Sequence, residues 1–306
     1  MAGWKRVRPV LLMAAADAVG ADAAKFLSVA CALEMIHTYS LIHDDLPAMD
    51  NDDYRRGKLT NHKVFGDGIA ILAGDGLLTL AFTVILRQQD VSADTLLRVV
   101  DEISRAAGAE GMVGGQVLDL RAEEHRISME EMRRVHMGKT GALFRAALRS
   151  GAILGGASEA QLAALTTYAE QFGLAFQITD DILDVVGTAE DIGKPVGSDE
   201  KNHKSTYVTL TSLSAAKELA QRTVDEAVLG IHDGRLAVAA RLLLHTCGGG
   251  VAVPEDLGRV AQRCDELLHV LVVFEELDGE VAGGIPLAQL GVFLQVLLHL
   301  PDAVLY

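Results

Sequence analysis

Two groups of aspartates have the residue types and spacing that could do chemistry in this chain. Each group lies at the end of a long apolar stretch with helical periodicity, where charged carboxylates are costly unless something neutralises them. Neither group contains cysteine or histidine, and oxygen ligands alone favour Mg²⁺ over zinc or copper. Because Mg²⁺ bound by few carboxylates keeps coordination sites for waters and phosphates, these groups predict a phosphorylated substrate. The first group is Asp44, Asp45 and Asp50, and the second is Asp180, Asp181 and Asp184.

Basic residues accompany both groups, although the chain as a whole is acidic, with a formal net charge of −15. An anionic ligand that is bound through metal would account for both kinds of residue. The carboxylates would bind the metal, and the basic residues would bind the anion. Arginine suits bidentate contact with phosphate, and lysine supplies a flexible point charge. The cations are Arg55 and Arg56 after the first group, Lys139 before the second, Lys194 and Lys204 after it, and Lys5 and Arg8 near the start.

The length and composition exclude several classes of protein. The chain has 306 residues, half of them hydrophobic, which is enough for one large domain or two modest ones. The acidic net charge argues against nucleic acid as the main partner. Three cysteines without metal-binding spacing indicate free thiols in a reducing compartment. The start has no signal-peptide pattern, and no uninterrupted apolar run reaches the ~18 residues of a membrane span. We therefore expect a cytoplasmic protein without a membrane span.

Apolar residues recur every three or four positions over most of the chain, which predicts an all-α bundle. The composition changes near Gly230, after which lysine, serine, asparagine and methionine disappear. We therefore expect a core over residues 1–230 and an atypical helical tail over 231–306, either a second small unit or an unrelated extension. The predicted helices of the core are 9–19, 22–46, 68–88, 92–107, 109–122, 128–137, 139–154, 158–185, 204–210 and 213–230.

The two aspartate groups differ in their predicted geometry. Asp180 and Asp184 occupy positions i and i+4 of one predicted helix, so they share a face about one turn apart. In the first group Pro47 breaks the helix, so that the helix ends at Asp44 and Asp50 returns after a short bulge. A solvated helix face and an ordinary acidic turn are the respective alternatives. The presence of both groups in one chain favours metal binding.

These motifs resemble those of the trans-prenyltransferase (polyprenyl synthetase) family. The resemblance covers about residues 3–230, with the motifs in the family's order and spacing. It implies an isoprenoid synthase-type helical bundle with a central catalytic cavity. The implied reaction condenses isopentenyl diphosphate with the allylic substrates dimethylallyl or geranyl diphosphate. The motifs are Ser40–Asp50, Arg55–Gly57, Gly114–Gln116 with Asp119, Lys139–Gly141, Phe176–Asp184, Gly193–Lys194 and Lys204–Tyr207.

The resemblance also implies a role for each matching residue. Asp44, Asp50 and Asp180 would ligate a trinuclear Mg²⁺ cluster. Asp45, Asp181 and Asp184 would be further ligands or would support the ligands from behind. Thr140 and Gln177 would line the reacting carbons. The allylic diphosphate would be held by Arg55, Lys139, Lys194 and Lys204, and isopentenyl diphosphate by Lys5, Arg8, His37 and Arg56.

The product is expected to be farnesyl diphosphate, a C15 compound. Tyr39 lies five residues before Asp44, and this aromatic together with the two-residue expansion of the first group is the family pattern linked to C15. The ring of Tyr39 would close the floor of the elongation pocket. A geranylgeranyl diphosphate synthase, a terpene cyclase on the same fold, and a catalytically impaired or regulatory partner subunit are the alternatives. The intact second group and the lysines disfavour the cyclase. The family resemblance implies a homodimer.

The chain departs from the family pattern at both ends. It begins almost at its first motif, so the family's leading helix is expected to be missing, and Trp4 stands where the family has a glycine. Residues 231–306 do not resemble the family's closing helices. Gln116 and Asp119 allow two interpretations, a structural polar pair on a helix or a part of the site.

Overall fold

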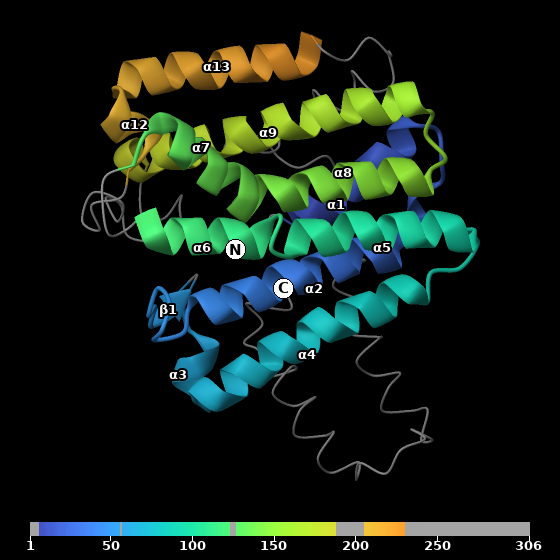
Figure 1. The fold of residues 1–306 in the computed structure, drawn as a ribbon, viewed down its shortest axis with the longest axis horizontal. Coiled ribbons are helices and arrows are strands. Elements are labelled where there is room, and N and C mark those ends of the chain that lie inside the picture. Colours follow the sequence, from blue (N-terminus) through green and yellow to red (C-terminus); the bar gives the residue numbers. More distant parts are fainter. Residues whose placement is uncertain (1–5, 56, 123–126, 188–204, 230–306) are drawn as a thin grey trace. The chain divides into compact units, whose positions relative to one another are not determined.

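The computed structural model describes residues 6–55, 57–122, 127–187 and 205–229. In this part nearly every element is helical, which confirms the predicted all-α class (Figure 1). The chain divides into two compact units. Of the described residues, the first unit contains 6–9, 27–55 and 57–87, and the second contains 10–26, 88–122, 127–187 and 205–229. The predicted tail, 231–306, lies outside the described residues.

The first unit is built on two long helices, α2 (Leu27–Asp44) and α4 (Asp67–Leu86), which pack along each other (Figure 1). Most side chains of α2 are buried, and a helix that is apolar on nearly all sides belongs in a core. A buried ion pair joins the start of the chain to α2, with Arg6 Nη1 2.9 Å from Glu34 Oε1. The connection from α2 to α4 contains the antiparallel strands β1 (Tyr54–Arg55) and β2 (Lys58–Leu59) and the short helix α3 (Asn61–Phe65).

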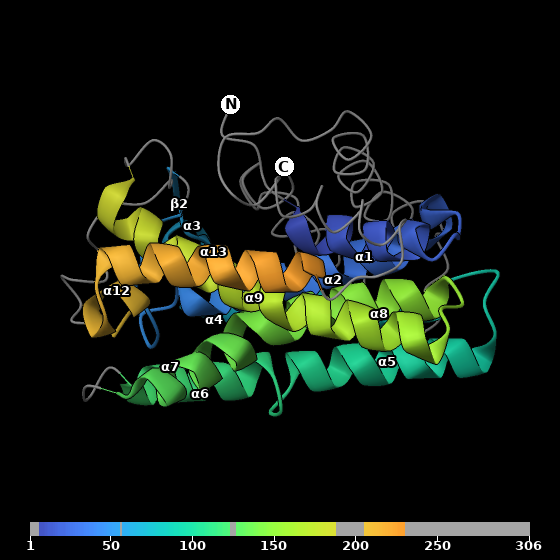
Figure 2. The same cartoon turned by 90° about the horizontal axis from the view of Figure 1, so that it is seen from above.

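The second unit consists of helices stacked side by side. Helix α8 (Ala142–Leu154) packs against both α5 (Ala93–Ala107) and α9 (Glu159–Val186), and α9 packs against α13 (Leu213–Leu229) (Figure 2). Arg149 of α8 links three of them, because its guanidinium binds Glu102 of α5 at 2.6 Å and donates to Thr166 Oγ1 of α9 at 2.6 Å. The other elements are η1 (Ala23–Phe26), α6 (Met112–Ala122), α7 (Met129–His136), η2 (Met137–Gly141), α12 (Tyr207–Leu210) and α1 (Val7–Ala18), whose first residues belong to the first unit.

Helix starts coincide with capping residues in the sequence. The hydroxyls of Ser92, Ser128 and Ser158 each accept a hydrogen bond from a backbone N–H in the first turn of α5, α7 and α9. Ser128 and Ser158 also form reciprocal capping boxes with Glu131 and Gln161. These bonds satisfy donors that a helix start leaves unpaired. At these three helices the predicted starts, 92, 128 and 158, each lie one residue before the observed start.

Three features differ from the sequence-based expectation. The β1–β2 hairpin and α3 were not predicted, because strands of two residues carry no readable alternation. The predicted break between 128–137 and 139–154 is a single turn of π-helix, η2, which joins α7 to α8. π-Helical turns inside helices occur often at functional sites.

Two helical segments have the length and apolar composition that a membrane span requires. They are Ala23–Asp44, which comprises η1 and α2, and Asp67–Leu86, which is α4. The sequence criterion of an uninterrupted apolar run had predicted none. The core helix of a soluble protein meets the test of length and composition equally well, and most of the first helix is buried inside the protein.

Candidate active site

The first aspartate group forms a compact loop at the end of α2. The helix ends at Asp44, as predicted, and the chain turns back so that the backbone N–H of Asp50 donates to the Asp44 carbonyl oxygen at 2.9 Å. Asn51 has φ 54°, a left-handed conformation that asparagine tolerates. Asp44 is partly exposed and Asp50 is exposed. The loop thus brings the backbones of these two residues together while leaving their carboxylates accessible.

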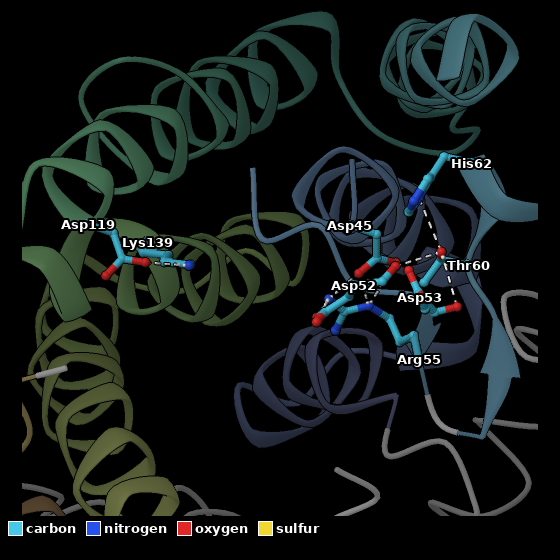
Figure 3. Close-up of polar contacts among 8 residues, drawn as sticks. All are labelled: Asp45, Asp52, Asp53, Arg55, Thr60, His62, Asp119 and Lys139. Carbon is cyan, nitrogen blue, oxygen red and sulfur yellow. Dashed lines mark hydrogen bonds and ion pairs between the residues drawn. The ribbon is translucent and has the colours of Figure 1, made fainter. Parts of the chain in front are cut away.

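Asp45 has an arginine partner. Arg55 Nε lies 2.8 Å from Asp45 Oδ1, and Arg55 Nη2 lies 2.5 Å from the same oxygen (Figure 3). Burial raises the pKa of the Asp45 carboxyl, and the hydrogen bonds and charge of Arg55 offset only part of this effect. The same contacts outweigh burial at Arg55 and raise the pKa of its guanidinium. Asp45 is therefore paired with a cation of the protein itself, a contact that the sequence does not predict.

Thr60 binds the hairpin to Asp52 and Asp53, which follow the first group. The Thr60 hydroxyl donates to the Asp52 carbonyl oxygen at 2.8 Å and lies 3.1 Å from His62 Nδ1 (Figure 3). The backbone N–H of Thr60 donates to the Asp53 carbonyl oxygen at 3.0 Å. Gly57, with φ 78°, makes the turn between the strands. These contacts fix the segment that carries Arg55.

The second aspartate group lies near the end of α9. Asp181 is buried, and its Oδ2 accepts a hydrogen bond from the backbone N–H of Tyr207 in α12 at 2.7 Å. Burial, and secondarily the Asp181 charge, raises the pKa of Tyr207 to about 12. Asp184 is also buried, with 2% exposure, whereas Asp180 is partly exposed. The alternative of a solvated helix face is therefore wrong, since two of the three carboxylates are inside the protein.

The turn η2 is held by close backbone contacts on two sides. A Cβ atom at Gly115 of α6 would lie 2.0 Å from the backbone nitrogen of Lys139. A Cβ atom at Gly173 of α9 would lie 3.2 Å from the Cα of Gly141. Side chains at these glycines would force the elements apart. The glycines therefore determine where the Lys-Thr-Gly motif lies in the second unit.

Lys139 binds Asp119 of α6, with its Nζ 2.7 Å from Oδ2 (Figure 3). On α9, Gln177 and Asp180 occupy positions i+4 and i+7 from Gly173, so they share the face that contacts η2. The second unit thus places Asp180 and Gln177 on the α9 face beside η2, which itself carries Lys139. Asp119, which the sequence left open between two interpretations, is the ion-pair partner of the predicted substrate lysine.

The remaining predicted residues occupy varied environments. Tyr39 is buried, and burial together with the Asp44 charge raises the pKa of its hydroxyl. Thr140, Arg8 and His37 are partly exposed. The predicted residues Lys5, Arg56, Lys194 and Lys204 lie outside the described residues.

No group of three His, Cys, Asp or Glu side chains converges as a ready-made metal cage within the described ranges. Mg²⁺ does not require one, because it is commonly bound through one or two carboxylates plus water and substrate phosphates. The accessible carboxylates of Asp44 and Asp50, on adjoining backbone, and of Asp180 are hard oxygen donors of this kind. The residues present therefore fit Mg²⁺ that is completed by a phosphorylated ligand.

The described residues form a nearly all-helical fold, with aspartate groups at the ends of two of its long helices. The polyprenyl synthetase family model matches residues 1–237, and the chain belongs to that family. Its identification as a prenyltransferase is confirmed. The chain is 54% identical over 219 residues to a farnesyl diphosphate synthase from Geobacillus stearothermophilus, covering 71% of this chain and 74% of the relative. It is 47% identical over 228 residues to a geranylgeranyl diphosphate synthase from Cyanophora paradoxa, covering 74% and 76%.

A solved structure shows the same fold. The chain superposes with a TM-score of 0.73 on a geranyltransferase from Helicobacter pylori complexed with magnesium and isoprenyl diphosphate. The two sequences are 31% identical, and the match covers 80% of this chain and 84% of the other.

Proposed function

We propose that this protein is a farnesyl diphosphate synthase, which joins isopentenyl diphosphate to dimethylallyl diphosphate and then to geranyl diphosphate. The observation that carries the proposal is the 54% identity with a farnesyl diphosphate synthase over most of both chains. Identity with the geranylgeranyl diphosphate synthase is lower, at 47%. Synthesis of the C20 product is therefore the second candidate.

We further propose that Asp44, Asp50 and Asp180 ligate a trinuclear Mg²⁺ cluster. The loop geometry of the first group and the partial exposure of Asp180 support this role. Bound Mg²⁺ would neutralise the charge that develops on the departing diphosphate. Asp45 and Asp181 would act behind the ligands, because both are buried and hydrogen-bonded within the protein.

The basic and polar residues would bind and orient the substrates. Lys139 would exchange Asp119 for the allylic diphosphate, which Arg55, Lys194 and Lys204 would also contact. Thr140 and Gln177 would face the reacting carbons. The predicted site for isopentenyl diphosphate is Lys5, Arg8, His37 and Arg56. Tyr39 would floor the elongation pocket, a role that suits its burial.

We also propose that the protein acts in the cytoplasm as a homodimer. Several large apolar side chains on α4 are exposed, namely Ile69, Ile71, Leu72 and Leu86. An exposed apolar face of this kind is typical of an association surface. Light scattering after size exclusion would give a dimer mass, and a monomer at micromolar concentration would contradict the proposal.

The test is product identification. Purified protein is incubated with Mg²⁺, dimethylallyl diphosphate and isopentenyl diphosphate, and the products are dephosphorylated and separated by mass. A C15 product is expected. A dominant C20 product would favour the second candidate, and the absence of any elongation would favour the regulatory subunit. Cyclic hydrocarbons would point to a cyclase.

A further inference from the structure

His43, next to the first aspartate group, is held in a notch on α4. The notch exists because position 74 is glycine. A Cβ atom at Gly74 would lie 2.1 Å from His43 Nε2 and 2.5 Å from His43 Cδ2. Distances this short cannot be accommodated, so any other residue at position 74 would displace the imidazole ring.

A hydrogen bond fixes the ring within the notch. His43 Nε2 lies 3.0 Å from the carbonyl oxygen of Ile71, one turn before Gly74 on α4. Because a carbonyl oxygen only accepts, the Nε2 atom of His43 carries the proton and donates it. The ring therefore has one position and one orientation relative to α4.

The imidazole also contacts Tyr39, one turn earlier on α2. The two ring centroids are 5.7 Å apart and the planes are nearly perpendicular, at 83°. This edge-to-face arrangement is a favoured geometry for aromatic pairs. Tyr39 is buried with 6% exposure, and the His43 ring packs against its ring. The position of the Tyr39 ring thus depends on a residue that α4 holds in place.

We propose that His43 is a positioning residue for product length. Because His43 contacts both α4 and Tyr39, the place of α4 determines where the ring of Tyr39 lies. The ring is thereby kept across the end of the elongation pocket. The inference rests on the proposed function, in which Tyr39 closes this pocket. It predicts that product length responds to a substitution on α4, a helix that has no predicted substrate contact.

The experiment compares the ratio of C20 to C15 products among variants, at equal soluble protein and at low conversion. His43→Ala removes the contact with Tyr39, and Gly74→Ala displaces the imidazole without changing it. Both are expected to raise the ratio by about tenfold, the effect of one lost aromatic contact on competing reactions. The ratio is measured within each reaction, so slower turnover or less folded protein does not change it.

Two further variants show whether the ring of His43 or its hydrogen bond to Ile71 acts on Tyr39. His43→Gln keeps a donor for the Ile71 carbonyl but loses the ring, and it should lengthen the product. His43→Phe keeps a ring beside Tyr39 and loses the donor, and it should restore C15. Gly68→Ala is the matched control on α4, since a Cβ atom there meets nothing within 4 Å, and it should leave the ratio unchanged.

The outcomes distinguish the inference from the proposed function. Wild-type protein that makes C15, with a longer product from Tyr39→Ala, supports the function and the pocket floor. If the His43 and Gly74 variants then still make only C15, the positioning role is wrong and the function stands. A Tyr39→Ala variant that makes only C15 would overturn the inference as well. Wild-type protein that makes no C15 would instead reject the function itself.

Discussion

At the scale of single residues, the partner of a buried carboxylate decides what a substitution costs. Asp45 is buried, and Arg55 contacts it through two nitrogens. Arg55→Ala leaves that charge unpaired, so we expect a loss of about 1–3 kcal/mol in the free energy of unfolding. Arg105→Ala is the control, because its pair with Asp101 is exposed and its loss should change the free energy of unfolding little. Urea denaturation measures both, and equal losses would mean that the Asp45 pair stabilises no more than a surface pair.

Tyr207 is a buried residue at which the loss of a polar group should not destabilise the protein. Its ring is buried, but its hydroxyl has no hydrogen-bond partner among the described residues. An unsatisfied buried hydroxyl is a cost, so Tyr207→Phe should leave the free energy of unfolding unchanged or raise it by up to about 1 kcal/mol. The backbone bond from residue 207 to Asp181 is unaffected by this change. A clear loss in thermal denaturation would show that the hydroxyl has a partner in solution.

At the scale of elements, η2 depends on a glycine of the neighbouring helix. In Gly115→Ala the new methyl group would meet the Lys139 backbone nitrogen at 2.0 Å, so α6 and η2 must separate. We expect a loss of about 1–3 kcal/mol from overpacking. We also expect kcat/KM for the allylic substrate to fall by about 100-fold, as for a misplacement of about 1 Å. Val113→Ala, at an exposed position of α6, is the control and should change neither quantity much.

The helices were predictable because their signals are local. Apolar periodicity and capping residues such as Ser128 and Ser158 lie within the segments that they define. The loop from Asp44 to Asp50 was also predictable, since Pro47 dictates a helix end. The contacts of Arg55, Lys139 and His43 were not, because each partner lies elsewhere in the sequence and is brought near by packing. The sequence does not predict that Gly74 makes room for His43, because this contact depends on the packing of α2 against α4.

At the scale of the whole molecule, the residues proposed to bind metal and diphosphate are divided between the two units. Of the described residues, the first unit supplies Asp44, Asp50 and Arg55, and the second supplies Asp180 and Lys139. Neither set includes three convergent metal ligands within the described ranges. A ligand that contributes its own oxygens would complete the coordination. Binding of metal and binding of diphosphate should therefore depend on each other.

This dependence is measurable as thermal stabilisation. Mg²⁺ together with inorganic diphosphate, at about 100 times the dissociation constant, should raise the Tm by about 5–10 °C. Diphosphate alone should raise it little, because without metal the carboxylates of the two groups repel the anion. Asp44→Ala and Asp180→Ala should each remove most of the shift and abolish turnover while the protein stays folded. Asp94→Ala, an exposed aspartate at the start of α5, should retain the full shift. Equal shifts with and without Mg²⁺ would contradict metal bridging, and a full shift in either variant would remove that aspartate from the metal site.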